Sequence, residues 1–302
     1  MRVFVAGGSG TIGIPLVQAL VHAGHQVTAL TRSSGKQPFL RGLGATPAVA
    51  DALDAAALKT VVAAARPTHV IHQLTALPKG GARRASDLAA TNRLRIDGTR
   101  HLIEAAISAG ATRLIGGSFA LIAEPRLDLP RSAGEGADAI ASMERQILEA
   151  SDAGRIEGIV LRYGLFYGPD NPATEQIVAL VRRRMLPVVR DDRGLMPCIH
   201  VADAVSATVA ALDHGSPGHV YDIVDDRPVS MSEIVRAVAE YTGSPAPLAV
   251  PAWVMRLLAP YLAGITALRL PLSNANARAE LGWQPRFSTW RDGLSAMLAR
   301  AA

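Results

Sequence analysis

The chain opens with the stretch Arg2-Val3-Phe4-Val5-Ala6-Gly7-Gly8-Ser9-Gly10-Thr11-Ile12-Gly13, in which an apolar run passes directly into a glycine-rich turn. The run has the composition of a short buried strand, and Ile12–Ala23 has the apolar spacing of a helix. Gly7 permits the tight turn, Gly10 lets the backbone approach a pyrophosphate, and Gly13 lets helix and strand pack closely. The free N–H groups at the start of the helix suit phosphates. The stretch therefore predicts a dinucleotide-binding strand–turn–helix unit.

The alternation of strand and helix patterns continues along the chain. We expect strands at Val3–Ala6, Gln26–Thr31, Thr46–Ala50, His69–Leu74, Arg113–Gly116 and Gly158–Arg162, and helices at Ile12–Ala23, Asp54–Ala65, Ser86–Ala109 and Asp138–Ala153. Continuous apolar strands, each followed by a helix, are typical of a parallel sheet covered on both faces. Because crossovers between parallel strands are right-handed, the expected fold is α/β, a doubly wound parallel sheet of the Rossmann type.

The end of the second expected strand indicates which dinucleotide is bound. An NAD site needs a carboxylate about 20 residues after the glycine turn, where it accepts a hydrogen bond from the ribose 2′-OH. Here the strand is followed by Arg32 and Ser33, and no acidic residue occurs before Asp51. A guanidinium beside a hydroxyl suits a 2′-phosphate, with Lys36 also in reach. The sequence therefore favours NADP as the cofactor, with NAD as the alternative.

Asp51 and Ala52 follow the third expected strand, at a place that faces the adenine ring in such folds. A carboxylate there can accept from the exocyclic amine of adenine. Asp51 equally suits the N-cap of the next helix, although Asp54 is the better cap.

The pattern loosens after Gly168-Pro169. A helix is expected at Thr174–Arg184, then a strand–helix–strand unit at Met196–His200, Ala202–Asp213 and His219–Val224, and a mostly helical remainder broken by prolines. We predict that residues 1–165 and 196–224 form the NADP-binding Rossmann domain. Residues 166–195 and 225–302 are expected to form a smaller, mostly helical substrate-binding lobe, with a ligand cleft between the two.

Composition excludes several classes of protein. The chain has 302 residues, 49% hydrophobic and 19% charged, which suits a globular protein with a sizeable core. One cysteine, Cys198, excludes a disulfide framework and a cysteine-based zinc site. His69 and His72 point to opposite faces of a strand, so no metal site is expected. The net charge of +5 comes mainly from scattered arginines, which argues against a nucleic-acid surface. With no targeting segment or membrane span recognised, we expect a cytoplasmic protein.

Several further segments carry a resemblance to a known family. In chain order they are Gly7–Gly13, Val70–Ala76, Leu161–Pro169, Ile199–Asp203 and Ala279–Pro285. Together they resemble the extended short-chain dehydrogenase/reductases, also called the NAD-dependent epimerase/dehydratase family, over almost the whole chain. No single segment identifies the family, but the five segments in this order do.

The resemblance implies a set of cofactor-binding residues. They are Gly7, Ser9, Gly10, Thr11, Ile12, Gly13, Arg32, Ser33, Asp51, Ala52, Leu74, Thr75, Ala76, Tyr163, Gly164 and Leu165. Asn92 also resembles a helical asparagine of the family, but it lies one turn early relative to Gly98-Thr99. The implied partners are NADP and a small-molecule substrate, with no nucleic acid and no membrane.

The chain departs from the family at its chemistry. The family uses a tyrosine that exchanges the substrate proton, a lysine that lowers the tyrosine's pKa and holds the nicotinamide ribose, and a serine that polarises the carbonyl. The tyrosine and lysine form a YxxxK motif on the helix after the fifth strand. Alignment on Ser142 puts Ala139 and Met143 at those positions, and no lysine follows Lys79. The serine position is kept as Ser118, so the chain is identified as an atypical member that lacks YxxxK.

Three functions remain open. The first is an NAD(P)(H)-dependent oxidoreductase in which another group supplies the proton, with Ser118, Tyr163, Tyr167 and His200 as candidates. The second is a non-catalytic NADP(H)-binding sensor or scaffold. The third, a serine hydrolase, is disfavoured because Gly116–Ala120 lacks the closing glycine of a nucleophile elbow. We predict the first function, with Ser118 and Tyr163 as the catalytic residues.

Two finer expectations concern the substrate and the assembly. The apolar segment Trp253–Leu258 favours a small hydrophobic alcohol or ketone over a nucleotide sugar. In the resembled family the helices matching Ser86–Ala109 and Asp138–Ala153 pair across a dyad, so a homodimer is implied.

Overall fold

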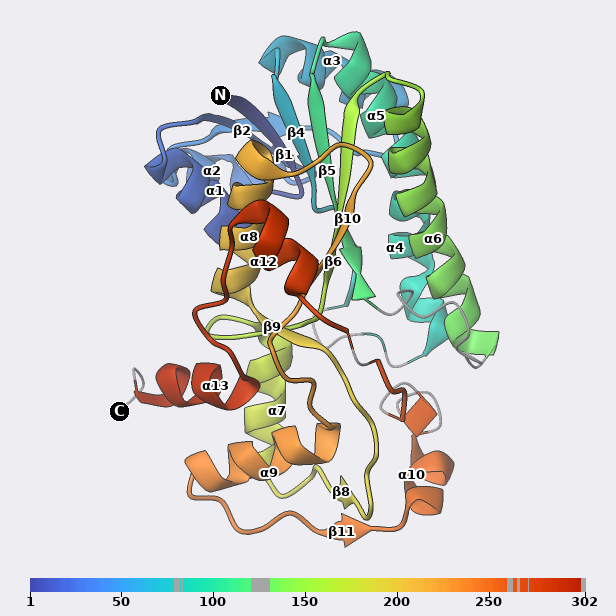
Figure 1. Cartoon of the computed structure of the whole chain (residues 1–302), viewed down its shortest axis with the longest axis vertical. Helices are drawn as coiled ribbons and strands as arrows, with labels where there is room; N and C mark the ends of the chain where they lie inside the picture. Colours follow the sequence, from blue (N-terminus) through green and yellow to red (C-terminus); the bar gives the residue numbers. More distant parts are fainter. Residues whose placement is uncertain are drawn as a thin grey trace.

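The computed structural model describes residues 1–78, 82, 84–120, 131–259, 263–264, 267–270 and 272–299. At its centre is a seven-stranded sheet in the order β10-β6-β5-β4-β1-β2-β3, and every pairing within it is parallel (Figure 1). The strands are β1 (Arg2–Ala6), β2 (Gln26–Thr31), β3 (Thr46–Val49), β4 (His69–His72), β5 (Arg113–Phe119), β6 (Glu157–Tyr163) and β10 (Val220–Ile223). The predicted doubly wound parallel sheet is confirmed.

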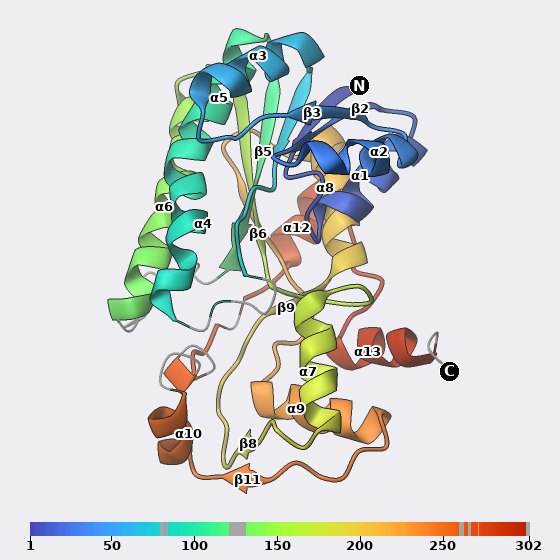
Figure 2. The same ribbon diagram turned by 180° about the vertical axis from the view of Figure 1, so that it is seen from behind.

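Helices cover both faces of this sheet (Figures 1 and 2). One face carries α1 (Gly13–His22) and α8 (Val201–His214), and the other carries α3 (Ala55–Ala65), α5 (Thr99–Ser108) and α6 (Arg131–Asp152), while the short α2 (Gln37–Gly42) follows β2. In β1, Val3 and Val5 belong to the apolar cluster that includes α1 and α8. Phe4 and Ala6 belong to the cluster that includes α3, α5 and α6, because successive strand side chains point to opposite faces.

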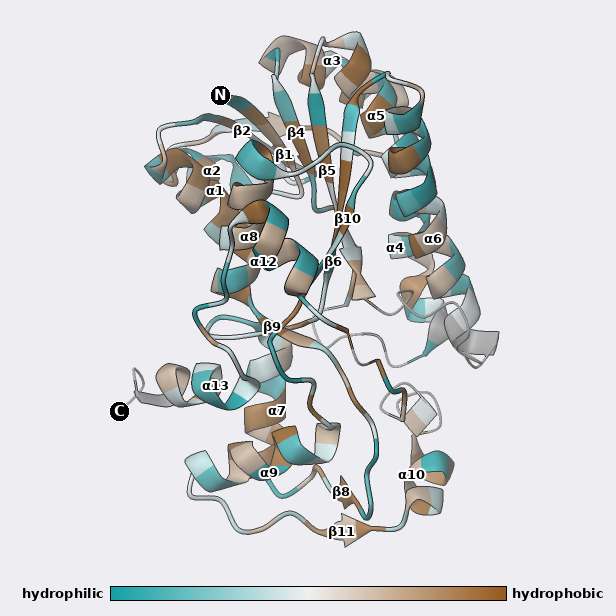
Figure 3. Ribbon diagram, in the orientation of Figure 1, coloured by the Kyte–Doolittle hydropathy of each residue, from teal (hydrophilic) through white to brown (hydrophobic). Residues whose placement is uncertain are grey.

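The surfaces of the covering helices follow the same logic. In Figure 3, α6 alternates between hydrophobic and hydrophilic residues, as expected for a helix with one buried face. Met143 and Ile147 of α6 are buried in the second cluster, whereas Arg145 and Glu149 are exposed.

The long helix predicted at Ser86–Ala109 is interrupted. It consists of a 3-10 turn η2 (Ala85–Leu88), the short helix α4 (Ala89–Arg93), a π-helical turn η3 (Leu94–Gly98) and then α5. A π-turn admits one more residue per turn than an α-helix, and such turns are frequent at functional sites. Here it buries Leu94 and Gly98 against the inner parts of the protein.

A smaller, mostly helical lobe lies beyond the ends of β5 and β6, in the lower half of Figure 1. Its helices are α7 (Pro172–Arg182), α9 (Met231–Tyr241), α10 (Ala252–Leu258) and α13 (Trp290–Ala299), and its short strand pairs are β7 (Leu165–Tyr167) with β9 (Cys198–His200) and β8 (Val188–Val189) with β11 (Ala249–Val250). Most of these elements contribute to a third apolar cluster, which includes Tyr167, Val181, Ile234, Val238 and Trp290.

The residue boundaries of the two predicted domains remain a proposal, and two elements depart from them. The strand β9 was assigned to the Rossmann domain but pairs with β7 of the lobe. The helix α12 (Ala275–Leu281) was assigned to the lobe, but Ala277, Leu281 and Trp283 are buried in the cluster of the sheet domain. The Trp283 indole donates to Ser206 Oγ of α8 at 2.9 Å. The Asp203 carboxylate, also of α8, accepts from the following backbone N–H groups of Arg286 and Phe287 at 2.9 and 3.0 Å. These bonds join the region of α12 and the residues after it to α8.

Candidate functional site

The glycine turn between β1 and α1 is built for a close backbone approach. Gly7 has φ +94°, and a Cβ there would lie 2.5 Å from the Gln73 carbonyl oxygen. A Cβ on Gly13 would overlap the Gly7 carbonyl oxygen and the Gly8 backbone. The helix α1 begins without a side-chain cap at Ile12, so its N-terminal end is available to an anion. The turn thus fits the pyrophosphate of a dinucleotide.

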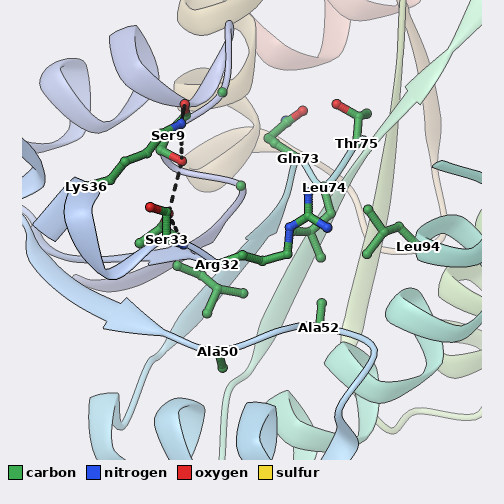
Figure 4. Close-up of a pocket in the computed structure, with 14 residues that line it drawn as sticks. Ser9, Arg32, Ser33, Lys36, Ala50, Ala52, Gln73, Leu74, Thr75 and Leu94 are labelled. Atoms are coloured by element: carbon green, nitrogen blue, oxygen red, sulfur yellow. Dashed lines mark hydrogen bonds between the residues drawn. The ribbon is translucent and has the colours of Figure 1, made fainter. Parts of the chain in front are cut away.

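A cavity of about 250 Å³ lies beside this turn, at the carboxyl ends of β1, β2, β3 and β4 (Figure 4). It is lined by Gly7, Ser9, Gly10, Leu30, Thr31, Arg32, Ser33, Lys36, Ala50, Ala52, Gln73, Leu74, Thr75 and Leu94. A cavity at this edge of an open α/β sheet is the usual place for a ligand.

The sequence prediction and this lining overlap in part. The structure brings together Gly7, Ser9, Gly10, Arg32, Ser33, Ala52, Leu74 and Thr75 around the cavity, but the lining does not include Thr11, Ile12, Gly13, Asp51, Ala76, Tyr163, Gly164 or Leu165. Asp51 instead accepts from the Leu53 N–H at 3.0 Å, and Asp54 caps α3, as the sequence favoured. Leu94 was missed because its inward position depends on the π-turn.

One end of the cavity is basic. Arg32 is exposed, makes no hydrogen bond or ion pair with any described residue, and extends across the cavity toward Leu74 in Figure 4. Lys36 Nζ donates to the Ser9 carbonyl and Oγ atoms at 3.3 and 3.4 Å. None of the residues that line the cavity is acidic. These groups suit a phosphorylated ribose and offer no carboxylate to a free 2′-OH.

Replacing Lys36 with methionine is expected to weaken NADPH binding by no more than about fivefold. Lys36 is exposed, and exposed charge pairs contribute only about 0.2–1 kcal/mol. Calorimetric titration of the variant checks this. A loss of a hundredfold or more would make Lys36, rather than Arg32, the principal phosphate ligand.

Ser118, at the position of the family's serine, belongs to a buried polar cluster. Ser118 Oγ donates to Glu144 Oε1 of α6 at 2.5 Å. Arg162 of β6 donates two hydrogen bonds to the same carboxylate, from Nε at 2.9 Å and from Nη2 at 2.7 Å. The single hydroxyl proton of Ser118 is therefore donated to the Glu144 carboxylate. The Ser118 oxygen can then only accept a hydrogen bond from a substrate. The cluster joins β5, α6 and β6.

Asp222 lies beside this cluster. It pairs in register with Arg162 across β10 and β6, and its Oδ1 atom is buried without a hydrogen-bond partner. Burial raises the pKa of Asp222, the Arg162 charge lowers it, and Glu144 raises it. Sequence reasoning missed Glu144 and Asp222 because nothing in the local pattern reveals which strand a helix residue faces.

Tyr163 lies on the other face of the sheet. Its hydroxyl contacts Thr208 Oγ1 of α8 at 2.7 Å and accepts from Gln73 Nε2 at 2.9 Å. Burial raises its pKa to about 12, and the residue is 2% exposed. The structure does not bring Tyr163 together with Ser118, so its predicted catalytic role has no support in the geometry.

The other proposed proton donors are also engaged. The Tyr167 hydroxyl donates to Asp225 Oδ2 at 2.9 Å, and His200 Nδ1 accepts from the Ala202 N–H at 3.1 Å as the cap of α8. Ala139 and Met143, at the positions assigned to the tyrosine and lysine, are each 1% exposed and apolar. Nothing at those positions on α6 can exchange a proton.

His69 and His72 do not form a metal site. His72 is buried, with Nε2 bonded to Thr99 Oγ1 at 2.8 Å and Nδ1 accepting from the Leu74 N–H. His69 contacts Thr68 Oγ1 instead. Within the described ranges no three His, Cys, Asp or Glu side chains gather as metal ligands.

None of the helices in those ranges combines the length and the apolar composition of a membrane span.

Comparison with known proteins places these features in context. The model of the NAD dependent epimerase/dehydratase family matches residues 3–224. The chain is 39% identical to the 3-diazoavenalumate denitrifying reductase of a Streptomyces species, over 97% of this chain and 99% of that protein. It is 30% identical to the 4-hydroxy-2-methyl-3-oxo-4-farnesyl-3,4-dihydroquinoline-1-oxide ketoreductase of Stigmatella aurantiaca, over 98% and 96%. The Thermus thermophilus UDP-glucose 4-epimerase complex with NAD shares the fold, with a TM-score of 0.77 at 24% identity over 99% and 98% of the two chains.

Proposed function

The chain belongs to the NAD-dependent epimerase/dehydratase family, and from that premise we propose that it is an NADPH-dependent reductase of a small organic substrate. It is accordingly an oxidoreductase-type enzyme that uses a nicotinamide dinucleotide. The observation that carries the choice of NADPH is the acid-free cavity beside the glycine turn, in which Arg32 has no hydrogen-bond or ion-pair partner among the described residues.

Different residues around the cavity are assigned to different parts of NADPH. The backbone of the glycine turn holds the pyrophosphate, Arg32 and Ser33 meet the 2′-phosphate, and Leu30, Ala52 and Leu94 provide apolar walls for the adenosine. When bound, NADPH would supply the hydride for the reduction. Ala139 and Met143 of α6 are each 1% exposed and apolar, so neither can supply a proton to a substrate.

The missing proton donor favours one class of hydride acceptor. Reduction of a ketone leaves an alkoxide, which needs a proton, and Ser118 already donates its own to Glu144. Hydride delivered to a ring carbon that carries a diazonium group forms a C–H bond while the C–N bond breaks. The bonding pair leaves with N2, so no alkoxide arises. An aryl diazo compound is therefore our first candidate, and the name of the Streptomyces relative, a 3-diazoavenalumate denitrifying reductase, also refers to a diazo substrate.

A hydrophobic ketone is the second candidate. Trp253, Leu257 and Leu258 of α10 are exposed by 62–74% in the lobe, and the Stigmatella relative is named as a ketoreductase. A homodimer through α4, α5 and α6 remains part of the proposal.

The test supplies NADPH with either a diazophenol or the matching aryl methyl ketone. We expect NADPH oxidation with release of N2 from the first and at least tenfold slower turnover of the second. Deuterium from labelled NADPH should appear on the ring carbon that carried nitrogen. Faster turnover of the ketone would favour the second candidate. Binding of NADPH with no turnover of either would refute a reductase and favour the sensor alternative.

A further inference from the structure

Arg95 lies in the π-turn η3 with its charge unpaired. Its side chain is partly buried, and it makes no hydrogen bond or ion pair with any described residue. Burial lowers its pKa to about 10, so it remains charged at neutral pH. A guanidinium with five N–H donors and no acceptor inside a protein is costly unless a ligand or water completes it.

An unpaired acceptor lies one turn earlier on the same helical segment. Asn92 Oδ1 is buried without a hydrogen-bond partner, while its amide nitrogen donates to the Glu135 carbonyl of α6 at 3.4 Å. The segment thus carries an unsatisfied donor at Arg95 and an unsatisfied acceptor at Asn92. Buried polar atoms of native proteins are normally satisfied, so a missing partner here calls for a ligand.

The helical segment that carries these two residues reaches the cofactor cavity at Leu94. Leu94, the neighbour of Arg95, lines the cavity, and so do Gln73, Leu74 and Thr75, which follow His72 at the end of β4. Burial, and after it the charge of Arg95, lowers the pKa of His72 to about 4, so Arg95 lies near that strand end. A dinucleotide whose 2′-phosphate is bound at Arg32 and whose nicotinamide points toward the ends of β5 and β6 would pass close to η3.

We propose that Arg95 and Asn92 bind the ribose on the nicotinamide side of NADPH, with Arg95 donating to a hydroxyl oxygen and Asn92 accepting a hydroxyl proton. A ribose hydroxyl is both acceptor and donor and satisfies both orphan groups. A phosphate or a substrate carboxylate has no proton for Asn92 and would meet its oxygen unfavourably. Arg95 would thereby supply, from η3, the ribose contact that the absent lysine of α6 cannot make. The inference rests on the proposed binding of NADPH.

The experiment compares two ligands on the same variants by calorimetry. Adenosine 2′,5′-bisphosphate fills the Arg32 end of the cavity but lacks the second ribose, whereas NADPH has both ends. We expect Arg95→Met to weaken NADPH binding by about 10- to 100-fold and to change bisphosphate binding by less than about twofold. Arg95→Lys should recover part of the NADPH affinity.

Arg93→Met is the matched control, because Arg93 is an exposed arginine two residues earlier, at the end of α4. It should leave both affinities unchanged. Thermal unfolding of the ligand-free Arg95→Met protein should occur at or above the wild-type temperature, because the variant removes an unpaired buried charge. A markedly lower temperature would indicate a structural role and contradict the inference.

Two further outcomes would overturn it. Equal weakening of both ligands would mean that Arg95 acts through the general charge of the cavity. Unchanged NADPH affinity with a raised KM for an anionic substrate would assign Arg95 to the substrate instead. If the wild-type protein binds both ligands but turns over no substrate, only the proposed reductase function fails, and this comparison still stands. Failure of the wild-type protein to bind either ligand would overturn both proposals.

Discussion

Replacing Arg32 with alanine is expected to weaken NADPH binding by about 10- to 100-fold and to leave NADH binding unchanged. Arg32 is exposed in the cavity and makes no hydrogen bond or ion pair with any described residue, so the variant removes no such interaction from the ligand-free protein. A charge-assisted contact contributes about 1.5–3 kcal/mol, and each 1.4 kcal/mol is tenfold in affinity. NADH has no 2′-phosphate and loses nothing.

Calorimetric titration of NADPH and NADH into each variant measures this difference. Arg41→Ala is the control, since Arg41 is an exposed arginine that donates to Gln37 Oε1 on α2 and does not line the cavity. Arg32→Lys should lie between wild type and alanine because a lysine keeps the charge but not the paired N–H geometry. Parallel losses of NADPH and NADH affinity would contradict a 2′-phosphate role for Arg32.

Replacing Glu144 with alanine is expected to lower the free energy of unfolding by about 3–5 kcal/mol. The side chains of Glu144 and Arg162 are only 5% and 22% exposed, and the variant leaves Arg162 buried without its acceptor. Ser118 loses its acceptor as well. Denaturant unfolding followed by circular dichroism measures the change.

The matched control for Glu144 is Glu149→Ala on the same helix. Glu149 pairs with Arg145 at 3.8 Å, and both side chains are more than 60% exposed, so the loss should stay below about 1 kcal/mol. The double variant Glu144→Leu with Arg162→Met removes both charges and should recover most of the stability. A single Glu144→Ala variant as stable as wild type would show that the cluster does not hold β5, α6 and β6 together.

The sequence was most informative where structure is decided locally. The glycine turn, the order of strands and helices, and the basic end of β2 all follow from residues near one another in the chain. The break in the helix predicted at Ser86–Ala109 was not visible, because a π-turn leaves the apolar composition unchanged and only its spacing slips by one residue. The positions of Leu94 at the cavity and of Arg95 in the partly buried π-turn could therefore not be predicted from the sequence.

The arrangement around the candidate catalytic residues was less predictable because it depends on pairing between distant segments. Arg162 and Tyr163 are consecutive on β6, so their side chains must point to opposite faces. Ser118 pairs in register with Arg162, which places Tyr163 on the far side. The sequence shows that neighbouring residues of a strand point to opposite faces of the sheet. It does not show the pairing register, which decides whether Ser118 shares a face with Arg162 or with Tyr163. Likewise, nothing local connects Glu144 with Ser118.

The most direct test of the account is a calorimetric titration of the wild-type protein with NADPH and NADH side by side. The account predicts one site per chain and binding of NADPH at least tenfold tighter than that of NADH, because Arg32 faces a cavity without a carboxylate. Equal affinity for the two would remove the role given to Arg32, and no heat with either would contradict the dinucleotide site itself.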